Sequence, residues 1–233
     1  MLVLTLSFIK LLRDVYVVAG PELTHFYDAY TYLVTRKSTA ILIDAGSGLA
    51  TEEIFKNVRS IGIKLQMIKY LILTHGHYDH IGGAKKLKEK TNCKVVMHQL
   101  DAEVLEKADA TLSAADFYGE SFKPCNVDLK LTTKDKETLY LDNIIFEVLH
   151  IPGHTPGSIA LYYESVQGQK VLFGGDLHGP FSSKWQSDVK QWKKSIEKLL
   201  KLDISLLCEG HNIVKKDPRK WIRDLLKNVI QIT

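Results

Sequence analysis

The stretch that constrains this chain most is "LILTHGHYDHIGG", residues 71–83. Three histidines and an aspartate fall within six positions, soon after an apolar run. Four polar side chains this close together cannot share a hydrophobic core, because each buried polar group needs a partner. The stretch therefore predicts a buried strand that leads into a loop carrying a functional site. The four side chains are His75, His77, Asp79 and His80.

Three further residues of the same chemical type follow apolar strands later in the chain. His154 lies in "IPGHTPGS", Asp176 directly follows "VLFGG", and His211 ends "LLCEGH". Taken singly, each is more often a loop residue with a satisfied hydrogen bond. Loops held by rigid strands are where sites are built, and nearby glycines let the backbone approach a small ligand closely. The shared position at strand ends predicts that these three residues join the first four.

The spacing of the first four residues is typical of a metal site. In an extended segment residues i and i+2 point the same way, so His75 and His77 converge on one point. Asp79 and His80 begin a helix and face a second point. Imidazole and carboxylate groups suit zinc, iron or manganese, and the absence of a ligand-spaced cysteine pair argues against a structural zinc finger. Two ions about 3.5–4 Å apart, as in two-metal hydrolytic sites, would account for all the side chains.

The rest of the chain predicts a strand-rich α/β fold. At 233 residues, without a linker or low-complexity segment, the sequence predicts one domain over residues 1–233. Apolar residues at helical spacing predict the helices, with Thr51 as the cap of the first one. Strands first and helices last, twice over, favour two sheets packed face to face with helices outside. The expected strands are 15–20, 30–35, 39–46, 68–74, 94–98, 139–141, 144–151, 158–165, 170–176 and 204–210, and the expected helices are 51–61, 82–90, 188–202 and 218–230.

These motifs resemble those of the metallo-β-lactamase superfamily. "THGHYDHIGG" is similar to its His-x-His-x-Asp-His motif, and "PGHTPGS", "FGGD" and "EGH" match its later motifs in order. "ILIDAGSG" matches its early strand–Asp–Gly element, so the resemblance spans roughly residues 15–215. The resemblance implies a four-layer αβ/βα sandwich in a single domain, with a dinuclear metal site on one edge of the two sheets.

The resemblance also implies a role for each ligand. It implies two divalent metal ions, zinc first, with iron or manganese as alternatives, that share a bridging hydroxide. Asp79 would orient this hydroxide for attack. Asp44, in "LIDAG", would fix a ligand, and a turn-forming Asp before Gly is an equally good interpretation. By motif, His75, His77 and His154 would bind the first ion, Asp79, His80 and His211 the second, and Asp176 would bridge both.

Departures from the patterns of particular subgroups narrow the range of reactions that we expect this protein to catalyse. Position 77 is histidine where flavo-diiron oxygen reductases carry a glutamate, and Gly179 stands where quorum-sensing lactonases carry a tyrosine. The stretch after His211 is short for the helical portion that holds glutathione in glyoxalase II. A compact glyoxalase-II-like or lactonase-like metallo-hydrolase remains. We expect it to cleave a small ester, thioester or lactone.

Two alternative activities stay open. A persulfide dioxygenase would use a single iron held by His75, His77 and either Asp176 or His154. An RNA-processing nuclease of the same fold is suggested only by the net charge of +4 and by "KKDPRK" at 215–220. Lysines of this kind are typical of a solvent-exposed face, whereas nucleic-acid binding requires a clustered basic surface. We therefore expect a small-molecule substrate and no nucleic acid.

Two segments are predicted to wall the metal site: residues 99–124, which we expect to be helical in part before a break at Gly119 and Pro124, and the loop 177–186. Phe117 and Tyr118 in the first segment would give an apolar pocket, and core packing is an equally good interpretation of both. His178 in the second segment would hydrogen-bond the substrate or donate a proton, with an ordinary polar contact as the alternative. His25, in "PELTHFYDAY", would reach the site from an N-terminal loop. We take these four side chains as the candidate substrate-binding residues.

The remaining features concern the cellular setting. Cys93, Cys125 and Cys208 are an odd, widely spaced set, typical of reduced thiols in a cytoplasmic protein. Residues 1–18 lack the basic region and cleavage site of a signal peptide, so we expect them to form the first strands and do not expect hydrolysis of antibiotics. No run approaches the ~18 apolar residues of a membrane span, so we expect no membrane. A homodimer is left open.

Overall fold

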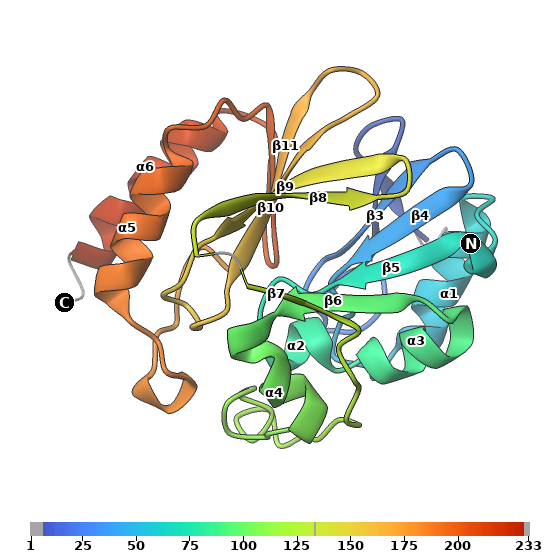
Figure 1. Ribbon diagram of the computed structural model, residues 1–233, viewed down its shortest axis with the longest axis horizontal. Helices are drawn as coiled ribbons and strands as arrows, with labels where there is room; N and C mark the ends of the chain where they lie inside the picture. The colour runs from blue at the N-terminus through green and yellow to red at the C-terminus, as the bar shows by residue number, and fades with distance from the viewer. Residues whose placement is uncertain (1–6, 133, 231–233) are drawn as a thin grey trace, which may run out of the picture.

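Two β-sheets packed face to face form the centre of the computed structural model, which describes residues 7–132 and 134–230 (Figure 1). In the first sheet, strands β1 to β4 pair antiparallel and strands β4 to β7 pair parallel. Its strands are, in spatial order, β1 (Ile9–Lys10), β2 (Val15–Ala19), β3 (Thr31–Arg36), β4 (Thr39–Ile43), β5 (Ile68–Ile72), β6 (Lys94–His98) and β7 (Leu129–Leu131).

The second sheet is built from the second half of the chain. Its strands pair antiparallel from β8 to β11, then β11 pairs parallel with β12, and β13 closes the edge antiparallel to β12. In spatial order they are β13 (Ile213–Val214), β12 (Leu206–Glu209), β11 (Lys170–Gly175), β10 (Ile159–Glu164), β9 (Ile144–His150) and β8 (Lys136–Leu141).

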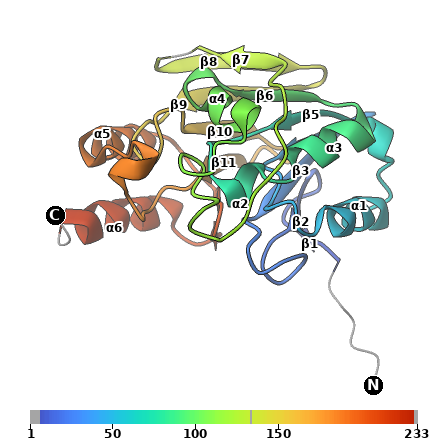
Figure 2. The ribbon, with the colours of Figure 1, turned by 90° about the horizontal axis from the view of Figure 1, so that it is seen from below.

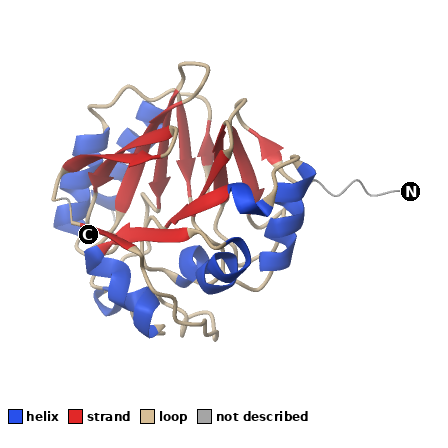
Figure 3. Ribbon diagram, turned by 45° about the vertical axis from the view of Figure 1, so that its right-hand side comes forward, coloured by secondary structure: helices blue, strands red, loops and turns tan. Residues whose placement is uncertain are grey.

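Helices cover the outer faces of both sheets, as Figure 3 shows in blue. The hydrophobic residues of α1 and α3 pack on the first sheet, and those of α5 and α6 pack on the second, where Figure 1 shows them in orange and red. Described helices are α1 (Thr51–Ser60), α2 (Tyr78–Ile81), α3 (Ala84–Thr91), α4 (Gln99–Lys107), α5 (Val189–Leu199) and α6 (Pro218–Ile230), with short 3₁₀ turns at Leu65–Met67 and Ser183–Trp185.

Three separate apolar clusters hold these layers together. One lies between α1, α3, α4 and the first sheet, one lies between the two sheets, and one lies between the second sheet and α5 and α6. The middle cluster forms because strand side chains alternate between the two faces of a sheet, so each strand can feed two cores. This is the predicted four-layer αβ/βα sandwich in a single domain, and that prediction is confirmed.

The predicted ligands all follow strands at one edge of the two sheets. The backbone N–H of Ile159 donates to the carbonyl oxygen of Thr74 (2.9 Å), which joins the two sheets at this edge. The two sheets therefore hold the ligand loops at a fixed separation. His75 follows β5, His154 lies between β9 and β10, Asp176 follows β11 and His211 follows β12.

Some local predictions differ from the structure. Thr51 is the first residue of α1 and not its cap: Ala50 precedes the helix without a side-chain cap, and the Thr51 hydroxyl donates to the Gly48 carbonyl oxygen (3.1 Å). Strands β7 and β13 have three and two residues and were not predicted, because so short a run has no periodicity to detect. Of the segment expected to form the first strands, residues 1–6 lie outside the described residues. None of the helices described here is long and apolar enough to cross a membrane.

Candidate metal centre

The loop after β5 is held in place by Asp44, which follows β4. The Asp44 carboxylate accepts hydrogen bonds from the backbone N–H (2.8 Å) and the hydroxyl (2.9 Å) of Thr74, and lies 2.8 Å from Nδ1 of His80. Its φ of 64° is in the left-handed region, which aspartate tolerates better than most residues. Asp44 therefore combines both features considered from the sequence, because it shapes the turn and orients His80, one of the predicted ligands.

This network decides which nitrogens face the centre. The Thr74 hydroxyl has one hydrogen and gives it to Asp44, because a carboxylate only accepts. The His75 Nδ1, 3.1 Å from the Thr74 oxygen, must then be the donor in that contact. In a neutral imidazole this leaves Nε2 unprotonated, with its lone pair free. His80 likewise donates from Nδ1 to Asp44. Both histidines thus turn an unprotonated Nε2 toward the centre when their imidazoles are neutral.

Four of the seven predicted ligands form what we term the first group. Each offers one ligand atom, these atoms lie within 4.8 Å of one another, and all four residues are buried. The Nδ1 of His77 is 2.8 Å from the Nε2 of His154. The Nε2 of His75 is buried without a hydrogen-bond partner among the described residues. Since buried polar atoms are nearly always partnered, an ion at this point would complete the arrangement. The first group is His75, His77, His154 and Asp176.

The other three residues form the second group, Asp79, His80 and His211. The Nε2 of His211 lies 3.1 Å from Oδ2 of Asp79, and the Nε2 of His80 lies 3.6 Å from the same oxygen. The Nε2 of His80 faces carboxylate oxygens of Asp79 and Asp176 but makes no well-aligned hydrogen bond to a described residue. The geometry therefore offers a second set of nitrogen and oxygen donors beside the first.

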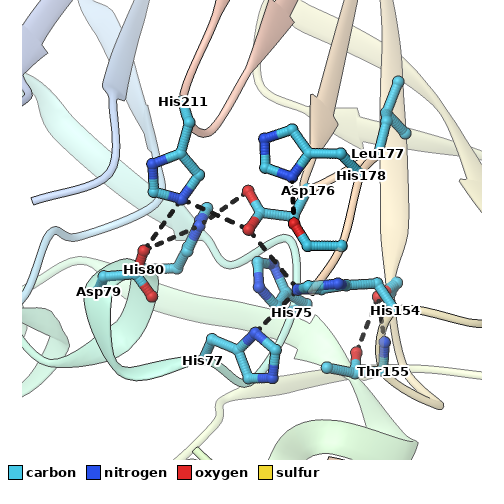
Figure 4. A network of polar contacts seen from close by, with 12 residues as sticks. His75, His77, Asp79, His80, His154, Thr155, Asp176, Leu177, His178 and His211 are labelled. Atoms are coloured by element: carbon cyan, nitrogen blue, oxygen red, sulfur yellow. Dashed lines mark hydrogen bonds and ion pairs between the residues drawn. The ribbon is translucent and has the colours of Figure 1, made fainter. Parts of the chain in front are cut away.

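Asp176 belongs to the first group and also faces the second (Figure 4). Its Oδ2 is 3.6 Å from Nε2 of His154 and 3.4 Å from Nε2 of His211, and its Oδ1 is 3.2 Å from Nε2 of His80. One carboxylate thus faces histidines of both groups. This is the position that a bridging ligand occupies in a two-metal site.

Gly210 lets the last ligand enter this crowded space. A Cβ at Gly210 would collide with the carboxylate of Asp176 and the ring of His80. The Gly210 N–H donates to the carbonyl oxygen of Gly175 (2.9 Å), so the chain stays paired until it reaches the centre. The glycine of the "EGH" motif is therefore required for close approach of the backbone to the ligands.

The histidines of the first group are held neutral. Burial lowers the pKa of His77 to about 4 and that of His154 to about 3. Burial also holds the pKa of His75 well below its usual value, and the nearby histidines act in the same direction. A neutral imidazole is the form that binds a metal, so this group needs to lose no proton at pH 7.

The histidines of the second group are held charged in the absence of an ion. Burial opposes the charge, but hydrogen bonds to Asp176 and Asp79 outweigh it and raise the pKa of His211 to about 10. The nearby carboxylates likewise outweigh burial and hold the pKa of His80 well above its usual value. Several carboxylates in one buried space thus attract positive charge, which protons supply here and a divalent cation would supply more fully. The donor set of imidazole and carboxylate fits zinc, iron or manganese.

Comparison with known proteins identifies the family. Residues 26–211 match the family described as the metallo-beta-lactamase superfamily. The chain belongs to the metallo-beta-lactamase superfamily. This match covers all seven predicted ligands and confirms the resemblance that the motifs indicated.

Two relatives of this chain are named as hydrolases. The protein is 28% identical over 201 residues to a hydroxyacylglutathione hydrolase of Pelagibacter ubique, covering 82% of this chain and 70% of that protein. It is 31% identical over 145 residues to hydroxyacylglutathione hydrolase GloC of Haemophilus influenzae, covering 60% of this chain and 62% of that protein. A metallo-beta-lactamase variant of Cronobacter sakazakii has the same fold, with a TM-score of 0.84 at 18% identity over 97% of this chain and 96% of that one. The family match and the named relatives together show that the chain with the sequence printed here is a metal-dependent hydrolase.

Of the two histidines predicted to contact substrate, one lies at the centre. The ring of His178 stacks on that of His211 with centroids 5.7 Å apart, and its Nδ1 contacts the carbonyl oxygen of Gly179 (2.6 Å). The contacts of His25 are local, since its Nδ1 accepts from the backbone N–H of Tyr27 (3.1 Å). The loop that carries His25 does reach the centre, because the N–H of Ala29 donates to the carbonyl oxygen of Asp79 (3.2 Å).

The two aromatic residues predicted to contact substrate lie in the segment after α4, which crosses α2 in Figure 2. Phe117 is 77% exposed, so the interpretation of this residue as core is wrong. The ring of Tyr118 packs against Tyr27 and against Tyr78 of the ligand loop, with centroids 5.2 and 5.5 Å apart. Burial raises the pKa of Tyr118, and the charges of Asp79 and Asp176 raise it further. Tyr118 therefore stays protonated at pH 7.

Sequence reasoning missed three residues around the centre. The ring of Trp185 is 5.1 Å from that of His77, and the ring of Phe181 is 6.2 Å from that of His154. Both lie in the loop 177–186. The signal that could have identified them is an aromatic residue close in sequence to a predicted ligand, Asp176. Asp101, in the first turn of α4, is 2% exposed and bonds to two ligand loops. Nothing in the local sequence distinguishes it from a surface aspartate of an amphipathic helix.

Proposed function

We propose that this protein uses two divalent metal ions, zinc first, to hydrolyse a small ester, thioester or lactone. The observation that carries the proposal is the convergence of seven ligand-type side chains into two adjacent groups with one carboxylate between them. A dinuclear site is the arrangement that such a set fits best. The first ion would be held by His75, His77 and His154, the second by Asp79, His80 and His211, and Asp176 would contact both.

The ions and the residues around them would have distinct tasks in this reaction. When bound, the ions would supply a hydroxide nucleophile at neutral pH and polarise the scissile carbonyl group. Asp79 would accept a hydrogen bond from the attacking water and so orient it. Asp44 keeps Nε2 of His80 turned inward by accepting a hydrogen bond from the Nδ1–H of His80. The Tyr118 hydroxyl, protonated at neutral pH, would donate a hydrogen bond to the substrate.

The substrate would lie between the two loops that flank the centre. Phe117 and Tyr118, whose rings contact each other, would form one part of its wall, and His178, beside His211, would form another. His25 would contribute through movement of its loop, which is bonded to the ligand loop at Asp79. The names of the two relatives describe hydrolysis of an acyl group carried by glutathione, which favours a thioester among the three candidate bonds.

The cysteines support a cytoplasmic location for this activity. Cys93, Cys125 and Cys208 are all buried and all free. Unpaired buried thiols are common in reducing compartments and rare in secreted proteins.

The test combines metal analysis with a panel of substrates. We expect the purified protein to contain or take up two divalent ions, to hydrolyse at least one ester, thioester or lactone, and to lose this activity with a chelator. Restoration by zinc, compared with iron and manganese, would identify the effective ion. A protein that takes up no ion and cleaves none of these substrates would contradict the proposal. Oxygen uptake with glutathione persulfide, or salt-dependent retention of RNA, would instead favour one of the two alternative activities.

A further inference from the structure

A buried carboxylate outside both ligand groups holds two of the ligand loops. Asp101 lies in the first turn of α4, which follows β6, and is 2% exposed. Its Oδ2 accepts hydrogen bonds from the backbone N–H of Gly76 (2.8 Å) and the hydroxyl of Thr155 (2.6 Å). Its Oδ1 accepts from the backbone N–H of Gly157 (2.7 Å). Three donors meet one side chain that has only acceptors, so both carboxylate oxygens are engaged.

The three donors belong to the loops of the first group. Gly76 stands between His75 and His77, and Thr155 directly follows His154. These loops come from different halves of the chain, one after β5 and one between β9 and β10. A single carboxylate therefore fixes the distance between them.

The donor and acceptor of each hydrogen bond in this network can be assigned. The Thr155 hydroxyl must donate to Asp101, so in its contact with Ser158 (2.8 Å) it is the Ser158 hydroxyl that donates. The Ser158 oxygen in turn accepts the backbone N–H of Thr155 (3.1 Å). The loop after His154 is thus closed on itself and tied to α4.

The close packing of this contact leaves little freedom. A Cβ at Gly157 would lie 2.6 Å from Cγ of Asp101, so a side chain at this position would displace the carboxylate. A Cβ at Gly76 would lie 3.4 Å from Oδ2 of Asp101. The loop after His154 can approach α4 this closely only because the contact residue is Gly157, whereas a Cβ at Gly76 would make an ordinary van der Waals contact.

We propose that Asp101 is a positioning residue for the first group: by tying the Gly76 and Thr155–Gly157 backbones to α4, it sets the spacing of His77 and His154. The proposal rests on the proposed dinuclear centre. Asp44 orients His80 of the second group by direct contact, whereas Asp101 acts on the first group through the backbone of its loops. Outer partners of this kind typically change metal affinity about 10–100-fold when removed.

The main test is Asp101→Asn, which keeps the shape and turns an amide N–H₂ toward backbone donors. Competition with a chelator would measure the affinity of each site, and the electronic spectrum of the Co²⁺ form would report ligand geometry. We expect affinity for the first ion to fall by about 10-fold or more, with an altered Co²⁺ spectrum. Affinity for the second ion should stay within about threefold of the wild type, because its ligands keep Asp44.

Two further variants separate positioning from general stability. Thr155→Val removes one of the three donors and should give a smaller loss at the first site, whereas Thr155→Ser keeps the hydroxyl and should restore wild-type affinity. Asp14→Asn is the matched control. Asp14 is also buried and accepts from the Tyr163 hydroxyl (2.6 Å) and the Val166 N–H (2.9 Å), but it precedes β2, at the opposite end of the sheet from the ligands.

The outcomes are distinct from those of the proposed reaction. If Asp101→Asn lowers the melting temperature as Asp14→Asn does, but leaves first-site affinity and the Co²⁺ spectrum unchanged, the proposal is overturned. If Asp101→Asn does not fold, unchanged affinity in Thr155→Val overturns it and a loss rescued by Thr155→Ser supports it. A wild-type protein that binds two ions but cleaves no substrate would contradict the reaction and leave this test intact. A wild type that binds no ion would overturn both.

Discussion

The two ligand groups lie side by side, yet their surroundings differ. In the first group the side chains of His154 and Asp176 are 2% and 7% exposed, whereas in the second the side chain of His211 is 35% exposed. Burial keeps the histidines of the first group neutral, and carboxylates keep those of the second group protonated. The histidines of the first group are therefore neutral, the form that binds an ion, whereas those of the second group carry a proton that an ion must displace.

This difference predicts an order of binding. An ion entering the first group displaces no proton at neutral pH, while an ion entering the second must displace protons from His80 and His211. The second group also has the solvent-facing ligand, which gives an ion a path to exchange. We therefore expect the first ion to bind more tightly and exchange more slowly than the second.

The largest effect should come from Asp176→Ala, because this carboxylate faces both groups. We expect both ions to be lost, with affinities falling by more than the roughly 10–100-fold typical of losing an outer partner, and hydrolysis to disappear. Metal content by mass spectrometry and chelator competition would measure this. Retention of two ions by the variant would break the assignment of Asp176 to both groups.

His211→Ala should separate the groups. It removes the exposed ligand of the second group and leaves the first group complete, so we expect one ion to remain per chain and activity to fall by about 100-fold or more. His178→Ala, which removes the neighbouring stacked ring but no predicted ligand, is the control and should keep both ions. Loss of both ions from the His211 variant would show that the groups are not independent.

The pH dependence of binding tests the charge difference directly. Because the pKa of His211 is about 10, the free site is protonated below that pH and affinity for the second ion must fall as the pH falls. For each displaced proton the decrease is about 100-fold between pH 8 and pH 6. The first-ion affinity should stay flat over this range, because its histidines have pKa values of about 4 and 3. Titrations at several pH values with equal slopes for both ions would contradict the comparison.

The smallest effect is expected for Tyr118→Phe, which removes a hydroxyl whose pKa is raised by burial and by the charges of Asp79 and Asp176, without removing a predicted ligand. If this hydroxyl donates to the substrate, kcat/KM should fall by about 3–10-fold, the value of one ordinary hydrogen bond. Metal affinity at both sites should not change. Phe117→Ala, on the exposed neighbouring residue, should alter the stability of the fold by no more than about 0.5 kcal/mol. A Tyr118 variant with weakened metal binding would place this residue in the metal centre instead of the substrate wall.

Most of the fold was predictable because its signals are local. Apolar runs and helical spacing identified the long strands and both C-terminal helices, α5 and α6. The errors fall where local pattern has no information. Strands β7 and β13 exist because they pair with β6 and β12, and Thr51 fails as a cap because its hydroxyl is engaged by Gly48.

The opening motif and its three distant partners were enough to predict which seven side chains come together. Each of them follows an apolar strand, and apolar strands pack in the core and bring the loops that follow them to the sheet edge. Only the tertiary structure decided which ring nitrogen faces inward, which histidines hold a proton, and which group meets solvent. These properties depend on burial and on partners far away in sequence, such as Asp44 for His80 and Asp101 for the first group. Chemical type can be read along the chain, but protonation and spacing arise only when the two sheets close around the ligands.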